Sequence, residues 1–181
     1  DDEVRGIKQE KADKEAEQRA EDLKKTQELA EKKLNVEKTL NEQEHAANKA
    51  LFEWRELAAG NNAKELAKIK KEQLDAELKY LLEKLRIEEA EEKAKAERDV
   101  TNSDQLGTAI KNIEDRFRNE RLTAEKKTAD EIKQVEKELK EARNARWKEG
   151  SDGIKALLEG DLNGFVGHMG NVVKGEKSAW Q

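Results

Sequence analysis

The sequence predicts an all-α protein of long charged helices separated by short breaks that contain asparagine and glycine. Of its 181 residues, 44% are charged, 34% are hydrophobic and only 4% are aromatic. There is no proline, the residue that most often breaks helices. The apolar residues recur three and four positions apart, which is the helical period. High charge alone also fits disorder, but the regular spacing favours long helices.

Composition also limits the architecture and the partners. Large apolar residues are too few for a deep globular core, so we expect either an extended coiled-coil-like rod or helical hairpins. Both signs of charge are interspersed around a net charge of −5, which gives no basic face for specific nucleic-acid binding. The lack of cysteine excludes disulfides and thiolate chemistry. The chain starts at Asp1 within a helical pattern, so we expect it to be a piece of a longer protein.

The first predicted segment is one long helix over residues 1–59. Its better apolar stripe consists of Leu29, Val36, Leu40, Ala47, Ala50, Trp54 and Leu57. A break follows at 59–63, where Gly60 suits the left-handed position after a helix and Asn62 suits the cap of the next helix.

The second predicted segment, residues 60–100, is a helix with the most apolar stretch of the chain. That stretch contains Leu66, Ile69, Leu74, Leu78, Leu81, Leu82, Leu85 and Ile87. A second break follows at 100–104, where Thr101, Asn102 and Ser103 are all suitable caps for a third helix.

The third predicted segment, residues 101–150, carries one narrow apolar stripe with an eleven-residue repeat. Arg121 and Thr128 interrupt it. Eleven residues are close to three natural helical turns, so the repeat predicts nearly straight or slightly right-handed packing. A stripe this narrow needs another helix along its length. We therefore predict self-association of copies of the chain through the stripe, which consists of Leu106, Ile110, Ile113, Phe117, Ala124, Ile132, Val135 and Leu139.

The last predicted segment is a glycine-rich amphipathic helical tail over residues 151–181, after an end of the third helix at 150–153. Its apolar arc includes Leu158, Leu162, Phe165, Met169 and Val172, while Gly160, Gly164 and Gly167 fall on the opposite arc. The tail could be a flexible linker, a membrane-seeking helix or a closely packed helix whose glycines let backbones approach. We favour close packing.

The sequence offers little for catalysis. His45 and His168 are the only histidines, and they lack the further ligands or nucleophile that a zinc or catalytic site needs. We therefore predict no catalytic, cofactor-binding or metal-binding residues, and no enzyme. Trp54, Trp147 and Trp180 lie near segment ends. We interpret them as gap fillers, with anchoring at a partner or a membrane as the alternative.

Two runs resemble phage tail tape-measure proteins. They are Ala109-Ile110-Lys111-Asn112-Ile113-Glu114-Asp115-Arg116-Phe117-Arg118-Asn119-Glu120-Arg121, after a short polar turn, and Gly160-Asp161-Leu162-Asn163-Gly164-Phe165-Val166-Gly167. The second run is similar to the segment that comes after such helices in tape-measure proteins of Bacteroidetes phages. The resemblance covers residues 60–181 and carries over no catalytic residue.

The resemblance implies a structural virion protein that fills the tail tube, sets its length and is ejected ahead of the DNA. Its implied partners are copies of itself and the lumen of the tail tube protein, with the host membrane added if the tail acts during ejection. Its implied location is the virion tail lumen, after a soluble stage in the host cytoplasm. Two alternatives stay open: a cellular coiled-coil stalk or tether, and an ejected membrane-active helical protein.

Overall fold

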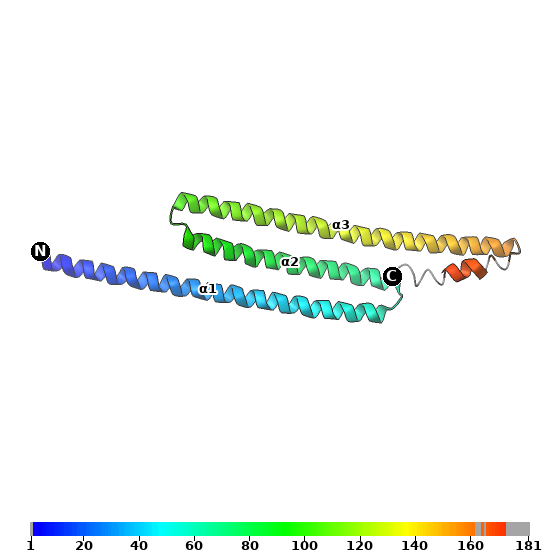
Figure 1. Ribbon diagram of the computed structural model, residues 1–181, viewed down its shortest axis with the longest axis horizontal. Helices are drawn as coiled ribbons and strands as arrows, with labels where there is room; N and C mark the ends of the chain where they lie inside the picture. The colour runs from blue at the N-terminus through cyan, green and yellow to red at the C-terminus, as the bar shows by residue number, and fades with distance from the viewer. Residues whose placement is uncertain (1, 162–163, 165, 173–181) are drawn as a thin grey trace. The chain divides into compact units, whose positions relative to one another are not determined.

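The computed structural model describes residues 2–161, 164 and 166–172, and this part of the chain is helical apart from short turns. The helices are α1 (Asp2–Ala59), α2 (Ala63–Asp99) and α3 (Ser103–Leu158) (Figure 1). Residues 164 and 166–172 are helical as well. The all-α prediction is therefore confirmed.

The chain divides into two compact units. Unit 1 comprises Asp1–Glu42 and Glu83–Asn119, and unit 2 comprises Gln43–Leu82 and Glu120–Gln181. Each of the three helices therefore contributes a segment to both units, and in each unit these segments lie side by side (Figure 1). The four predicted segments follow the helices, but the compact units cut across them, because periodicity along a helix does not show which segments pack together.

Neighbouring helices are antiparallel within each unit. In unit 1, Arg86 of α2 pairs with Glu37 of α1, and Arg98 of α2 pairs with Glu31 of α1. Residue numbers therefore rise along one helix as they fall along the other. The same reversal relates Arg55 and Glu44 of α1 to Glu72 and Lys79 of α2 in unit 2. Of the two predicted alternatives, rod and hairpins, the units show hairpins.

The turn between α1 and α2 has the predicted chemistry. Gly60 adopts φ +55°, and its N–H donates to the carbonyl of Glu56 at 3.3 Å, which closes the helix end. The side-chain oxygen of Asn62 accepts a 3.2 Å bond from the N–H of Glu65 and caps α2.

The turn between α2 and α3 selects one of the three predicted caps. The side-chain oxygen of Asn102 accepts hydrogen bonds from the N–H groups of Asp104 at 3.0 Å and Gln105 at 3.1 Å. These donors are among those that a helix start leaves without backbone partners. Asn102 is therefore the N-cap of α3.

The predicted end of the third helix at 150–153 is wrong. α3 continues to Leu158 and ends at Gly160, which has φ +80°, while the Asp161 N–H donates to the Ala156 carbonyl at 2.8 Å. This is a Schellman-type end. A glycine costs a helix only about 1 kcal/mol, and Gly153 and Ala156 are buried, so packing offsets that cost. The predicted tail therefore begins inside α3.

The core of each unit is small and is supplied by α2 and α3. The described buried side chains of unit 1 are Leu85, Ile87 and Phe117, and those of unit 2 are Ala67, Ile69, Val135 and Ala156. All are apolar, as expected for helices whose charged groups stay in water. Residues 9–59 of α1 include no fully buried side chain.

The apolar stripe predicted on the first helix points away from the other helices. We call it the outer row: Leu29, Val36, Leu40, Ala47, Ala50, Trp54 and Leu57, all exposed. The half-buried face of α1 instead contains mostly polar residues, among them Glu37, Asn41, His45 and Asn48. Trp54 and Trp147 are exposed too, so the interpretation of these two as gap fillers is wrong. Trp180 lies outside the described residues.

Candidate helix–helix interfaces

The predicted stripe on α3 is the covered face of that helix. Phe117 in unit 1 is 2% exposed and Val135 in unit 2 is 4% exposed. Arg121 and Thr128, the predicted interruptions, are half-buried. The other members of the stripe are half-buried as well: Leu106, Ile110, Ile113, Ala124, Ile132 and Leu139. Leu122, off the stripe, is 56% exposed. The eleven-residue repeat therefore marks the packed face, polar members included.

The helix that lies beside this face comes from the same chain. In unit 1, Lys93 of α2 binds Glu114 of α3 at 2.8 Å, and Arg116 of α3 pairs with Glu92 of α2. In unit 2, Lys71 of α2 binds Glu136 of α3 at 2.6 Å. Self-association through the α3 stripe stays a prediction, and it would require α3 to leave α2.

The face between α1 and α2 is polar and is joined by ion pairs and hydrogen bonds. In unit 2, Arg55 binds Glu72 at 2.5 Å, and the Gln73 amide donates to Glu56 at 2.7 Å. The Arg55 guanidinium also lies 5.6 Å from the ring centre of Phe52. The Arg55 and Glu72 side chains keep 27% and 39% of their surface exposed, and ion pairs that solvent reaches contribute about 1 kcal/mol at most. This face therefore fixes register more than it supplies stability.

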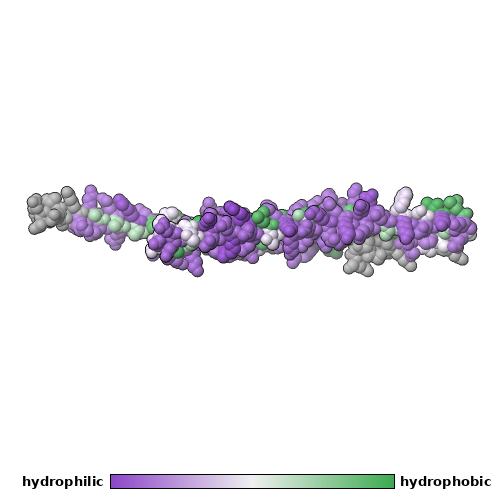
Figure 2. Space-filling view, turned by 90° about the horizontal axis from the view of Figure 1, so that it is seen from above, coloured by the Kyte–Doolittle hydropathy of each residue, from purple (hydrophilic) through white to green (hydrophobic). Residues whose placement is uncertain are grey.

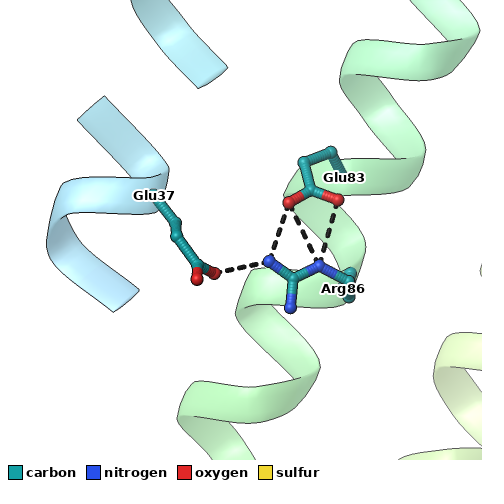
Figure 3. A network of polar contacts seen from close by, with 3 residues as sticks. All are labelled: Glu37, Glu83 and Arg86. Carbon is teal, nitrogen blue, oxygen red and sulfur yellow. Dashed lines mark hydrogen bonds and ion pairs between the residues drawn. The ribbon is translucent and has the colours of Figure 1, made fainter. Parts of the chain in front are cut away.

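Arg86 joins two carboxylates in unit 1, one on each of two helices. Its guanidinium binds Glu37 of α1 at 2.5 Å and Glu83 of its own helix at 2.7 Å (Figure 3). Hydrogen bonds to the two carboxylates, led by that of Glu83, raise the pKa of Arg86. This residue therefore stays charged and links α2 to α1.

Two other interface groups have shifted pKa values. The hydrogen bond from Arg55 lowers the pKa of Glu72, because it stabilises the carboxylate form. Hydrogen bonds to Glu114 and Glu89 raise the pKa of Lys93. Both shifts favour the charged state that makes the interhelical contact.

His45 lies in a packing contact of unit 2. Its ring stacks on that of Tyr80, with centres 4.0 Å apart and planes 15° from parallel. Its Nδ1 atom lies 3.6 Å from a carboxylate oxygen of Glu77. His45 and Glu77 line an open hollow, together with Asn48, Phe52 and Gln73. Among the described residues, no group of His, Asp and Glu side chains could hold a metal ion.

The described part of the tail folds back on the end of α3. His168 Nδ1 lies 2.9 Å from the Glu149 carboxylate, and hydrogen bonding with His168 lowers the pKa of Glu149. At Gly153, an added Cβ would lie 3.2 Å from the Cβ of His168, which is tight. Close packing therefore occurs at Gly153. On the predicted glycine arc, an added Cβ at Gly164 would meet the Asp161 side chain and lie 3.4 Å from the Cβ of Ala156, whereas at Gly160 and Gly167 it would meet open space.

The predicted apolar arc of the tail is only partly described. Leu158 and Met169 are exposed and Val172 is half-buried, while Leu162 and Phe165 lie outside the described residues. Within the described part of the chain, no helix combines the length and the apolar character that a bilayer crossing requires. The visible face of the molecule is mostly hydrophilic, with separate hydrophobic patches (Figure 2).

Three comparisons with known proteins gave no match: none with a protein-family model, none with a curated protein and none with a solved structure.

Proposed function

We propose that this chain is a structural helical segment of a phage tail tape-measure protein, which acts through its length and its helix contacts. The observation that carries the proposal is the eleven-residue repeat of covered positions along α3, from Leu106 to Leu139. The repeat includes Arg121 and Thr128, so position along the helix decides burial even where the side chain is polar. Such regularity suits an element whose residue count matters more than any single side chain.

The weakness of the interhelical contacts supports the same role. Seven described hydrophobic residues are buried across two units, and the ion pairs between helices are solvated. Burying a large apolar side chain contributes about 1.5–3 kcal/mol, and only Ile69, Leu85, Ile87, Phe117 and Val135 among the described buried residues are large, so few such contributions oppose separation of the helices. The helices can therefore fold back in the free chain and separate inside a narrow tube, where the tube wall replaces the neighbouring helix.

The proposal is tested by deleting residues 106–138 from the full-length gene. The deletion removes three eleven-residue units, so the stripe rejoins in phase. A helix rises about 1.5 Å per residue, so tails should shorten by about 50 Å in electron micrographs. A Leu122→Lys variant, changed at an exposed position without loss of length, is the control and should keep tails at wild-type length. Tails of unchanged length after the deletion would remove the ruler role of this segment.

A cellular stalk or tether is the second candidate, and the antiparallel packing within each unit favours it. A chain that doubles back adds less length than its residue count. In a stalk the hairpins persist in the working assembly, so the 33-residue deletion would break the packing of α2 against α3 rather than shorten the particle in proportion.

The membrane-active alternative draws support from the exposed apolar residues near the end of the described chain, Ile154, Leu158 and Val166. Its test is co-sedimentation of the full chain with vesicles of anionic and neutral lipid. Binding that Leu158→Asp abolishes would support a membrane role, and recovery of all protein in the supernatant would exclude it.

A further inference from the structure

The two faces of α1 differ in exposure. On the half-buried face, Leu34, Asn41, Asn48 and Arg55 lie seven residues apart, and Leu34, His45 and Glu56 lie eleven residues apart, so this face follows no single repeat. The outer row alternates steps of four and three residues when Lys33 and Gln43 are included as its polar members, so it repeats every seven residues. One helix thus has a covered, mostly polar face and an exposed row with the seven-residue spacing of coiled coils.

The outer row is the face of α1 that stays in water. Its members in unit 1 include Leu29 and Leu40, and in unit 2 Trp54 is 66% and Leu57 82% exposed. Lys33 and Gln43 are exposed as well. A row of apolar side chains at this spacing is how helices form a left-handed two-stranded coiled coil. The described chain covers the opposite face of α1, so a second helix can reach the row without displacing α2.

We propose that the outer row binds the α1 helix of a second copy of this chain, in parallel orientation. This inference rests on the proposed structural role, in which the chain acts through helix contacts, and it assigns self-association to α1 instead of α3. A helix from a second copy presents the same seven-residue row, so the two rows match in spacing and length.

Charge decides the orientation. Residues that flank such a row meet the partner five positions further along in a parallel pair. Lys32 of one copy then faces Glu37 of the other, twice per dimer. In an antiparallel pair with the middles of the rows aligned, Glu37 of one copy would face Glu44 of the other. These carboxylates already pair with Arg86 and Lys79 of their own copies, so the antiparallel pair gains no ion pair between copies at this place. Glu37 contributes one oxygen to Arg86, which leaves its other oxygen for Lys32 of the second copy.

The polar members of the row favour two strands. Lys33 occupies a position that points at its own counterpart in a parallel pair, and a lysine there limits oligomer number at a cost in stability. In a dimer the lysine ammonium can extend to water along the flank of the coil. The small Ala47 and Ala50 lie just before Trp54, which leaves room for the two indole rings to pack against neighbouring turns.

The experiment is sedimentation equilibrium of the full chain, wild type beside Leu40→Asp and Leu122→Asp. Both replaced leucines are exposed, but only Leu40 belongs to the outer row. The wild type and Leu122→Asp should be dimers, and Leu40→Asp should raise the dissociation constant by about 100-fold or more, because two carboxylates would be buried in the dimer. Circular dichroism should show equal helicity in all three. A monomeric wild type, or a Leu40→Asp dimer of wild-type affinity, would overturn the proposal.

Orientation is tested by disulfide formation, since the chain has no cysteine of its own. Ala47→Cys should link to itself across a parallel pair, whereas Glu42→Cys, exposed and off the row, should stay largely reduced. A dimer in which Ala47→Cys does not link would contradict the parallel arrangement. These outcomes are independent of tail length. If the wild type is a monomer and deletion of residues 106–138 shortens the tails, only the α1 dimer is refuted. If the wild type is a dimer and the deletion leaves tail length unchanged, only the proposed role in setting tail length is refuted.

Discussion

The Arg86 guanidinium of α2 donates a 2.5 Å hydrogen bond to the Glu37 carboxylate of α1. The two residues are 49 positions apart in the sequence. The contact exists only if the chain reverses direction between them, as it does at the turn around Gly60. Ion pairs between charged residues of two helices thus show which helices are neighbours.

Replacing Arg86 by methionine should therefore weaken the hairpin. The side chain is half exposed, so solvent screens the pair and the free energy of unfolding should fall by only about 1 kcal/mol or less. Urea denaturation followed by circular dichroism measures the change. Arg19→Met is the matched control, because within the described part of the chain Arg19 pairs with Glu15 of its own helix, at 3.9 Å. Equal losses in both variants would contradict an interhelical role for Arg86.

Ile87→Ala should have a much larger effect. Ile87 is among the most deeply buried side chains of unit 1, and truncation of such a residue usually costs about 2–5 kcal/mol. Thermal and urea denaturation of the variant should show the loss. Leu122→Ala, at an exposed position of α3, should change the stability by no more than about 0.5 kcal/mol. Similar losses at the two sites would contradict the placement of Ile87 in the core of unit 1.

The sequence predicts the three helices, the turn at Gly60 and Asn62, and the covered face of α3, but it offers three caps for α3 and ends that helix too early. Gly60 and Asn62 end and start helices by local chemistry, and the eleven-residue repeat on α3 is a property of one helix. Local signals of this kind do not depend on how the helices pack together. The end of α3 was missed because Gly153 is tolerated through a contact with His168, fifteen residues further on, and no local signal predicts that contact.

The arrangement of α1 could not be predicted in the same way. Its apolar stripe implied a packed face, and the structure packs the polar face instead. Either face of α1 can pack against a neighbouring helix. Which face does so depends on partners such as Glu72, Arg86 and Arg98 on α2. A single sequence does not predict which charged residues form ion pairs, since each glutamate has many candidate cations.

Glycine substitutions should have opposite signs at two positions. Gly107 lies inside α3 with open space around it, so Gly107→Ala should stabilise the chain by about 0.5–1 kcal/mol. Gly60 has φ +55°, and Gly60→Ala should destabilise it by about 1 kcal/mol, because an alanine is strained in that conformation. Melting temperatures of the two variants would show the contrast, and shifts of the same sign would contradict the assigned turn.

Acid should weaken unit 2 through Glu72. The hydrogen bond from Arg55 lowers the folded pKa of Glu72 below its ordinary 4.5. A lowered carboxyl pKa gives stability that is present above the unfolded value and is lost as the pH falls through the folded value. The melting temperature should therefore decline below about pH 4.5, and less steeply in Glu72→Gln. Glu28→Gln, at an exposed position, should leave the wild-type profile unchanged, and identical profiles for all three proteins would contradict a role for the pair.

The hairpins themselves are tested most directly by the distance between spin labels at Lys38 and Lys84, both exposed residues of unit 1. Double electron–electron resonance on the full chain, diluted with unlabelled protein to suppress intermolecular pairs, gives that distance. Packed helices have axes about 8–10 Å apart, so a hairpin predicts labels within about 25 Å of each other. A continuous helical rod would place them about 70 Å apart, at about 1.5 Å per residue. The short distance is expected in the free chain, and the long one would contradict the antiparallel packing of α1 and α2.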